Sequence, residues 1–178
     1  MAERNKFKNI IFFIFILGLI IGSFLNVLIV RLPRQKDILT FRNILGGRSK
    51  CPKCRKTIKW FDNIPVLSFL VLKGRCRFCR EKISRQYQIV ELLTGFLFLF
   101  SFWIFASNPV LLAYSLILIS LLIAIAFIDL NNFLILDNLI LAGFIVSFLF
   151  MFFTFRFWLP ASHLLGMIFV GGLFLILY

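Results

Sequence analysis

Acidic residues are scarce in this chain, which has 7 Asp and Glu among its 178 residues against 20 Lys and Arg. Five of the acids lie between Glu3 and Glu91, and only Asp129 and Asp137 follow. Any chemistry that needs a carboxylate in the second half therefore depends on these two residues. Histidine occurs once, as His163 near the start of the last apolar stretch, where it is typical of an interfacial residue rather than of a metal ligand.

We find no internal repeat and no low-complexity tract, which argues against a repeat architecture and against a disordered region. Cations are rare in the C-terminal part, where Arg156 is the single Lys or Arg after Arg85. What the chain has instead is apolar: 61% of its residues are hydrophobic, 25 are Phe, and the mean hydropathy is +1.00. This composition exceeds that of soluble domains and indicates a membrane protein.

Several apolar stretches are long enough to cross a bilayer, which takes roughly 20 residues per crossing. They run at about 9–30, 88–106, 109–128, 133–155 and 158–178. The first follows a basic stretch, as a signal peptide would. It is longer than a signal-peptide core and has no small-x-small cleavage site, so we interpret it as a retained span.

The cations predict the topology, because cytoplasmic loops of membrane proteins carry an excess of Lys and Arg. Sixteen of them lie between Arg31 and Arg85, against three before the first span. This count places the loop between the first two spans in the cytoplasm and the N-terminus outside. Alternating crossings then bring Asp129 and Asp137 to the cytoplasmic face of the membrane and Arg156 to the outer face.

The basic loop holds the four cysteines of the chain as two Cys-x-x-Cys pairs. Cys51 and Cys54 form the first pair, Cys76 and Cys79 form the second, and 21 residues separate the pairs. This spacing is close to that of zinc ribbons, and a reducing cytoplasm favours metal–thiolate bonds over disulfides. We expect one structural zinc, since four thiolates fill a tetrahedron and leave no position for water or substrate. Paired disulfides and an iron centre are the alternatives.

These features predict an all-α integral membrane protein, a polytopic helix bundle with about five spans and a small cytoplasmic zinc-binding loop domain. The expected parts are an N-terminal span at 1–31, the basic loop at 32–87 and further membrane helices at 88–178. A loop of this size seldom buries enough apolar surface to fold alone, so the metal would stabilise it. We expect its cations to meet the headgroups of membrane lipid. Nucleic acid is not expected as a partner, because the aromatic residues of the loop show no RNA- or DNA-binding signature.

The late aspartates are the main candidates for chemistry, because ionisable residues at membrane depth are costly and usually functional. Asp129 ends one apolar stretch, and Asp137 begins the next unless it only caps its helix. On one continuous helix the two would stand about 12 Å apart along the axis, too far to share a proton unless the chain turns between them. Glu91, early in the second stretch, is expected to pair with a loop cation such as Arg85, and the weaker alternative is that it binds the N-terminus of a substrate or a methyl donor.

Several short motifs follow one another along the chain. They are GSFLNV at 22–27, RLP at 31–33, SKCPKC at 49–54, WFDNIPVLS at 60–68, GRCRFC at 74–79, ISRQY at 83–87 with Glu91, and IDL at 128–130 with Asp137. In this order they resemble the type IV prepilin leader peptidase family. The resemblance covers nearly the whole chain, and the pattern of the loop is highly specific.

The resemblance implies a multi-pass aspartic endopeptidase of the bacterial inner (cytoplasmic) membrane. Such enzymes cleave the leader peptide of type IV prepilins and pseudopilins after a glycine, at the cytoplasmic face. Many members also methylate the new N-terminus with S-adenosylmethionine. By position, Asp129 matches the first catalytic aspartate of the family. Asp137 matches the second acid of an Asp-x6-Pro-Asp motif in which Leu136 replaces the usual proline.

The family has another catalytic aspartate, in a Gly-x-Gly-Asp motif that residues 1–178 do not contain. We therefore expect this chain to be truncated before that motif and to be inactive by itself. The alternative function is that of a non-catalytic zinc-loop membrane assembly factor of a pilus or secretion machine, or of a degenerate peptidase homologue.

Overall fold

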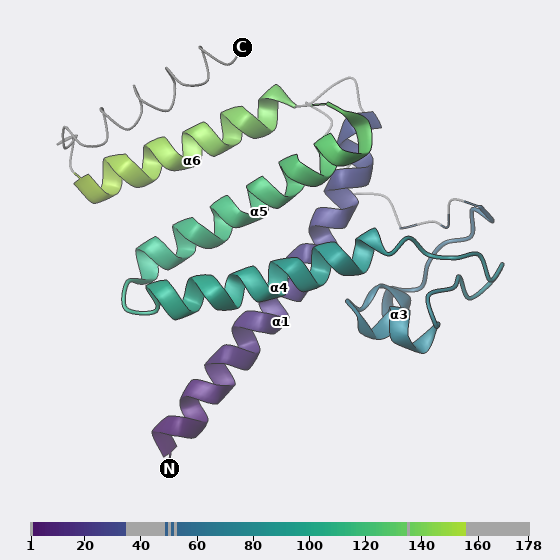
Figure 1. The fold of residues 1–178 in the computed structure, drawn as a ribbon, viewed down its shortest axis with the longest axis horizontal. Coiled ribbons are helices and arrows are strands. Elements are labelled where there is room, and N and C mark those ends of the chain that lie inside the picture. Colours follow the sequence, from purple (N-terminus) through teal and green to yellow (C-terminus); the bar gives the residue numbers. More distant parts are fainter. Residues whose placement is uncertain (1, 35–48, 50, 52, 135, 156–178) are drawn as a thin grey trace. The chain divides into compact units, whose positions relative to one another are not determined.

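The structure is a computed structural model that describes residues 2–34, 49, 51, 53–134 and 136–155. In chain order its helices are α1 (Ala2–Arg31), η1 (Leu32–Arg34), η2 (Trp60–Asn63), α3 (Leu67–Val71), α4 (Gln86–Phe105), α5 (Pro109–Asn132) and α6 (Asp137–Phe155), labelled where there is room in Figure 1. An isolated β-bridge joins Arg75 and Lys82. The chain divides after Ile140 into two compact units, and α1, α4 and α5 belong to the first.

Three helices are long and apolar enough to cross a membrane. They cover Phe7–Arg31 (25 residues), Gln86–Phe105 (20 residues) and Pro109–Asn132 (24 residues). The apolar part of α6, Asp137–Phe152, is shorter than these spans. The prediction of a helical protein with membrane-length helices is thus confirmed for the described residues, which contain three such helices; five spans are not confirmed. The expected fifth span at 158–178 lies outside the described residues.

Local sequence explains where α1 ends and where α5 begins. Arg31 occupies the last turn of α1, where a cation is favourable next to the partial negative charge of the helix end. Pro33 follows and cannot donate an N–H to a continuing helix. The side chain of Asn108 accepts a hydrogen bond from the Leu111 N–H at 3.1 Å, which caps the start of α5. Pro109 fits the first turn, where its missing N–H costs nothing.

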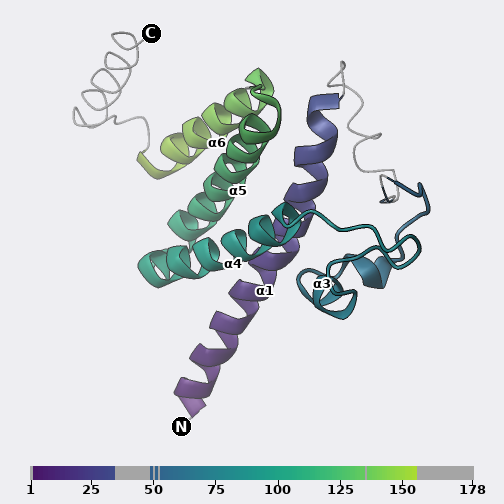
Figure 2. The same ribbon diagram turned by 45° about the vertical axis from the view of Figure 1, so that its right-hand side comes forward.

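Small residues allow α1 and α4 to cross in close contact (Figure 1 and, from another direction, Figure 2). A Cβ atom added to Gly18 would lie 2.6 Å from the Cα atom of Gly95. One turn further along α1, a Cβ atom added to Gly22 would lie 2.7 Å from the Cα atom of Glu91. The numbers of the contacting residues increase along α1 while they decrease along α4, so the two helices run antiparallel. Such close backbone approach at small residues is a common way to join helices in a membrane.

Buried polar side chains continue this interface. Asn26 is 3% exposed, and its side-chain amide donates to the backbone carbonyl of Tyr87 at 2.8 Å. Thr94 is fully buried, and its hydroxyl donates to the carbonyl of Val90 at 2.7 Å. Both groups are satisfied, as buried polar groups must be to avoid a desolvation penalty. The register of α1 on α4 is therefore fixed by small residues and hydrogen bonds as well as by apolar contact.

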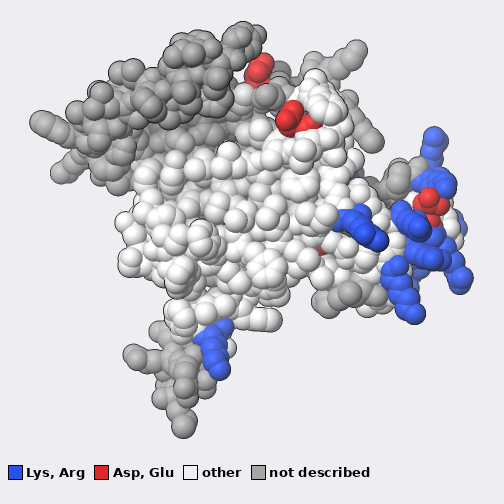
Figure 3. Space-filling view, in the orientation of Figure 1, with Lys and Arg blue, Asp and Glu red and all other residues white. Residues whose placement is uncertain are grey.

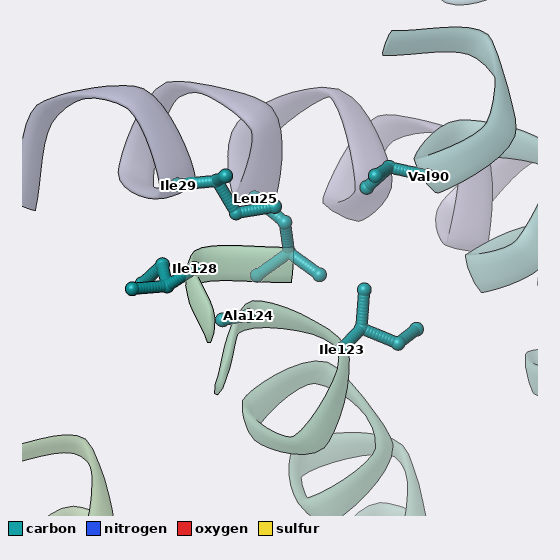
Figure 4. Close-up of a cluster of buried hydrophobic side chains, with 6 residues drawn as sticks. All are labelled: Leu25, Ile29, Val90, Ile123, Ala124 and Ile128. Atoms are coloured by element: carbon teal, nitrogen blue, oxygen red, sulfur yellow. The ribbon is translucent and has the colours of Figure 1, made fainter. Parts of the chain in front are cut away.

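An apolar cluster joins the second half of α1, the start of α4 and the second half of α5. Figure 4 shows its buried members, Leu25, Ile29, Val90, Ile123, Ala124 and Ile128. Val90 and Ile128 are at most 1% exposed. Because Ile128 precedes Asp129, this cluster places the end of α5 at the same end of the bundle as the first turns of α4. The cysteine loop joins the bundle at that end too, since it leads directly into α4.

Charged side chains are distributed very unevenly over the molecule. In Figure 3 the lysines and arginines gather over the loop before α4, and the helical face on view is almost free of charge. Besides Lys53 and Arg77, which form the two ion pairs of the loop, its described residues include eight exposed cations: Arg55, Lys56, Lys59, Lys73, Arg75, Arg80, Lys82 and Arg85. The loop thus combines a strong positive charge with a position next to apolar helices.

Candidate functional site

Each cysteine pair lies in a tight backbone turn. In the first, the Cys51 N–H donates to the Lys56 carbonyl at 3.0 Å, and the Arg55 N–H donates back to the Cys51 carbonyl at 2.9 Å. Arg55 has a φ of 56°, in the left-handed region that a non-glycine residue seldom adopts. The turn directs backbone N–H groups toward the cysteine sulfur, which suits a thiolate.

The second pair repeats this turn with an offset of 25 residues. The Cys76 N–H donates to the Glu81 carbonyl at 2.8 Å, the Arg80 N–H donates to the Cys76 carbonyl at 2.9 Å, and Arg80 also has a φ of 56°. The flanking bonds match as well: Ile58 N–H to Ser49 carbonyl at 2.7 Å, and Ile83 N–H to Gly74 carbonyl at 2.8 Å. The loop is therefore built from two equivalent halves.

This equivalence corrects the sequence analysis, which found no internal repeat. The signal was present as Cys-x-x-Cys-Arg-x-x-Ile, which begins at Cys51 and again at Cys76. Eight residues are too few to stand out in a search for long repeats. They are nevertheless enough to specify the same turn twice, because the hydrogen bonds of each turn are local.

The four sulfur atoms converge as predicted. All four Sγ atoms lie within 4.8 Å of one another, and those of Cys51 and Cys79 are 3.7 Å apart. A tetrahedral zinc with Zn–S bonds of about 2.3 Å separates its sulfurs by about 3.8 Å, so the cluster fits this ion. All four cysteines are free, and none forms a disulfide. Thiolates in this geometry could hold a metal such as zinc, with no position left for a substrate.

The surroundings of the four thiols lower the pKa of one of them and raise the pKa of another. Hydrogen bonds from the N–H groups of Cys54 and Lys53 lower the pKa of Cys51 to about 6. For Cys79, the N–H of Glu81 lowers the pKa, but desolvation and the neighbouring thiols outweigh it and raise the value to about 11. A metal ion would therefore displace a proton from this cluster when it binds at neutral pH.

Contacts between side chains connect the two halves of the loop and brace it. Lys53 of the first half forms an ion pair with Glu81 of the second, with Nζ and Oε2 2.7 Å apart. Lys56 lies over the ring of Phe78, 4.9 Å from its centroid. A two-bond pair also joins Arg77 to Asp62 of η2, with Nη2 and Oδ1 2.6 Å apart and Nε and Oδ2 2.9 Å apart. The Lys53–Glu81 pair is exposed and contributes little stability, so it orients the loop rather than holds it together. The Asp62 side chain is 6% exposed, so the second pair is partly buried.

The loop is attached to the helices through Glu91. This residue is 7% exposed, and its Oε2 atom accepts a hydrogen bond from the backbone N–H of Val66 at 2.9 Å. The expected ion pair with Arg85 is not formed: among the described residues the ion pairs are Lys53–Glu81 and Arg77–Asp62. The prediction was wrong because the loop folds back far enough to bring its own backbone to the carboxylate.

The chain turns between the two late aspartates. Phe133 has a φ of 51°, and its N–H donates to the Asp129 carbonyl at 2.7 Å, which ends α5. Asp137 then lies in the first turn of α6, where a negative charge is favourable. Both aspartates are exposed, and among the described residues no hydrogen bond joins their carboxylates. Because the helix ends between the two aspartates, the separation expected on one continuous helix does not apply. That the two carboxylates share a proton stays a prediction.

Comparison with known proteins gives the family. The sequence matches the family description "Bacterial Peptidase A24 N-terminal domain" over residues 16–105, which are 90 of the 178 residues. The matched region contains most of α1, the cysteine loop and the whole of α4. It therefore includes the cysteine cluster and Glu91, whereas Asp129 and Asp137 lie beyond it.

Curated relatives agree. The chain is 44% identical over 124 residues to the prepilin leader peptidase/N-methyltransferase of Myxococcus xanthus, with 67% of this chain and 34% of that protein covered. The corresponding protein of Klebsiella pneumoniae is 46% identical over 129 residues, which are 72% of this chain and 56% of that protein. The corresponding protein of Vibrio cholerae is 54% identical over 79 residues, which are 43% of this chain and 31% of that protein.

The chain thus spans between 31% and 56% of the length of these relatives. No solved structure matches it. The sequence motifs, the three membrane-length helices and the cysteine cluster agree with the match of the N-terminal domain. The chain belongs to the prepilin leader peptidase family of bacterial membrane proteins, and residues 16–105 are its peptidase A24 N-terminal domain.

Proposed function

We propose that this chain is part of an aspartic endopeptidase that removes the leader peptide of type IV prepilins or pseudopilins at the cytoplasmic face of the bacterial inner membrane. The observation that carries the proposal is the position of Asp129. It lies at the end of a membrane-length helix and directly follows Ile128, whose side chain is fixed in the buried cluster. A carboxylate held there is accessible to a peptide bond that leaves the membrane.

Asp129 acts with a second carboxylate. One ionised carboxylate takes a proton from water while the other, protonated, donates a hydrogen bond to the scissile carbonyl. Within residues 1–178 the candidate partner is Asp137, across the turn at Phe133. The resemblance offers the Gly-x-Gly-Asp motif as the other source of this carboxylate.

The cysteine loop supplies structure rather than the reaction. Four thiolates satisfy a zinc ion completely, and the metal stabilises a loop that has little apolar core of its own. The relatives are named prepilin leader peptidase/N-methyltransferase, which supports a second reaction, methylation of the new N-terminus with S-adenosylmethionine as methyl donor. We assign no residue to that reaction.

Charge supports the orientation in the membrane. The loop cations satisfy the rule that basic loops stay in the cytoplasm, and they suit anionic lipid headgroups as partners. The same charge would repel rather than attract the basic leader of a prepilin, so lipid is the better-matched partner for this surface. A non-catalytic assembly factor remains the competing function, since it would need the zinc loop and the spans but not Asp129.

The test is cleavage of a purified prepilin by the longest natural product of this gene, reconstituted in lipid. Asp129→Asn removes the charge and keeps the shape, so we expect leader cleavage to fall by at least about 1,000-fold while expression and metal content stay unchanged. Asn131→Ala, an exposed polar change in the same turn, is the matched control and should retain activity.

Asp137→Asn discriminates between the two sources of the second carboxylate. A loss as large as that of Asp129→Asn identifies Asp137 as the partner, whereas a small loss assigns the partner to the Gly-x-Gly-Asp motif of the longer protein. Undiminished cleavage by Asp129→Asn would refute the catalytic role of Asp129. Absence of cleavage by the unmodified protein would refute the peptidase proposal and favour the assembly factor.

A further inference from the structure

The junction between the cysteine loop and the helices depends on one buried carboxylate. Glu91 lies in the second turn of α4 and is 7% exposed. A carboxylate so deeply buried is unfavourable unless it has partners that replace water. Two hydrogen bonds from outside its own helix serve this carboxylate: one from the Val66 N–H at 2.9 Å and one from the side chain of Ser23.

The donor residue is held in an unusual backbone conformation. Val66 lies between η2 and α3 and has a φ of 58°. The left-handed region is strongly disfavoured for a β-branched residue, so the surrounding structure must hold it there. The bond from its N–H to Glu91 is a contact able to do so, since it fixes the peptide group on the N-terminal side of Val66.

The acceptor is held equally firmly by the opposite helix. Gly22 of α1 has no side chain, and a Cβ atom there would lie 2.7 Å from the Cα atom of Glu91. Ser23, the next residue of α1, lies beside the same carboxylate. The hydrogen bond from the loop to Glu91 therefore lies where the backbones of α1 and α4 are in close contact.

The packing around Glu91 extends to the end of α5. Val90 precedes Glu91 and is fully buried in the cluster that contains Ile128, which precedes Asp129. The side chains next to Glu91 and next to Asp129 thus belong to one packed group. A change in how the loop sits on Glu91 would reach the end of α5 through these contacts.

We infer that Glu91 is a positioning residue that docks the cysteine loop on the α1–α4 pair by accepting the Val66 N–H. What matters for this role is an oxygen acceptor at the right distance rather than a negative charge. The inference does not depend on the proposed peptidase activity, because it concerns only where the loop lies. The position of the loop can be tested by hydrogen–deuterium exchange without a substrate.

Hydrogen–deuterium exchange of the full chain in lipid nanodiscs tests it, with metal content measured in parallel. Glu91→Leu removes the acceptor, and peptides that cover 64–69 should then exchange about tenfold faster or more, because the Val66 N–H loses its buried hydrogen-bond acceptor. Glu91→Gln keeps an acceptor oxygen at the same reach and should stay within about threefold of the unmodified chain. Glu91→Asp keeps the charge but is one methylene too short, so it should behave like Glu91→Leu.

Ser101→Ala is the matched control. Ser101 is another buried polar residue of α4, 2% exposed, and its hydroxyl hydrogen-bonds to that of Ser115 in α5 rather than to the loop. Its loss should leave exchange at 64–69 unchanged. Metal content should stay the same in all four variants, because the sulfur cluster does not involve Glu91.

Two outcomes would overturn the inference. If Glu91→Leu leaves exchange at 64–69 unchanged, the loop is held elsewhere. If Glu91→Gln loosens the loop while Glu91→Asp does not, the charge and not the hydrogen bond is what the site needs. Because Gln and Asp are mild changes, this second comparison decides the question even if Glu91→Leu fails to accumulate.

Discussion

The close contact of α1 with α4 predicts that one substitution has opposite effects at two glycines. Gly→Ala inside a helix normally stabilises it by about 1 kcal/mol, because alanine has less backbone freedom to lose. At Gly143 of α6 no atom lies within 4 Å of the added Cβ, so Gly143→Ala should show that gain in full.

At Gly18 the added Cβ would lie 2.6 Å from the Gly95 Cα and 3.0 Å from the Thr94 carbonyl oxygen. Ordinary contacts begin at 3.4 Å, so the helices must separate by at least 0.8 Å, the difference between 3.4 and 2.6. Both obstacles are backbone atoms, which cannot rotate away as a flexible side chain would. Overpacking of this kind costs ~2–3 kcal/mol. After subtraction of the ~1 kcal/mol helix gain, Gly18→Ala should lower the free energy of unfolding by about 1–2 kcal/mol.

The assay is reversible unfolding of the purified chain in detergent, followed by circular dichroism, with the unmodified chain and both variants measured side by side. The expected order of stability is Gly143→Ala, then the unmodified chain, then Gly18→Ala. If Gly18→Ala were as stabilising as Gly143→Ala, α1 and α4 would not be in backbone contact, and the antiparallel register described above would be refuted.

The cysteine cluster gives further predictions. Elemental analysis should find one zinc per chain, and Cys76→Ser should lose it while the three membrane-length helices keep their helical signal, because their insertion depends on apolarity. In the metal-free chain the coupled thiols should titrate over a wide range, with the first thiolate near pH 6 and the last near pH 11, as followed by ultraviolet absorbance. Cys51→Ser should remove the step near pH 6; its persistence would assign that step to another thiol. Since the folded-state pKa of Cys51 is depressed below 9.0, its contribution to the stability of the metal-free loop should be present above pH 9 and be lost as the pH falls toward 6. For topology, maleimide labelling of a cysteine placed at Lys73 should occur from the cytoplasmic side, and labelling from the outer side would reverse the orientation.

The sequence predicted those features that depend on composition and on short spacing. Membrane-length helices follow from apolar length, and the meeting of Cys51, Cys54, Cys76 and Cys79 follows from two pairs at a metal-binding interval. Apolar length is a local property, and a shared metal ion would bring the two cysteine pairs together whatever path the intervening residues take. The four-cysteine cluster is therefore the part of the candidate site that could be recognised without a structure.

The attachment of the loop could not be predicted in this way. The partner of Glu91 is a backbone N–H, and a backbone group has no residue type that would mark it in a sequence. Arg85 was the expected partner because a sequence shows which residues are charged, whereas it does not show where the backbone of the loop lies. The same limit hid the antiparallel register of Gly18, Gly22 and Asn26 on α4, which becomes apparent only when the two helices are side by side.

The contact between α1 and α4 also has a consequence for biosynthesis. The two helices share one interface, but the cysteine loop lies between them in the chain. From Arg31 to Phe105 the ribosome must add 74 residues (105 − 31). At ~5–20 residues per second this takes about 4–15 s. During this interval the amide of Asn26 has no Tyr87 carbonyl to bind, and the backbone surface at Gly18 and Gly22 is uncovered. The rate at which the loop is made thus determines how long α1 persists in the membrane as an unpaired helix.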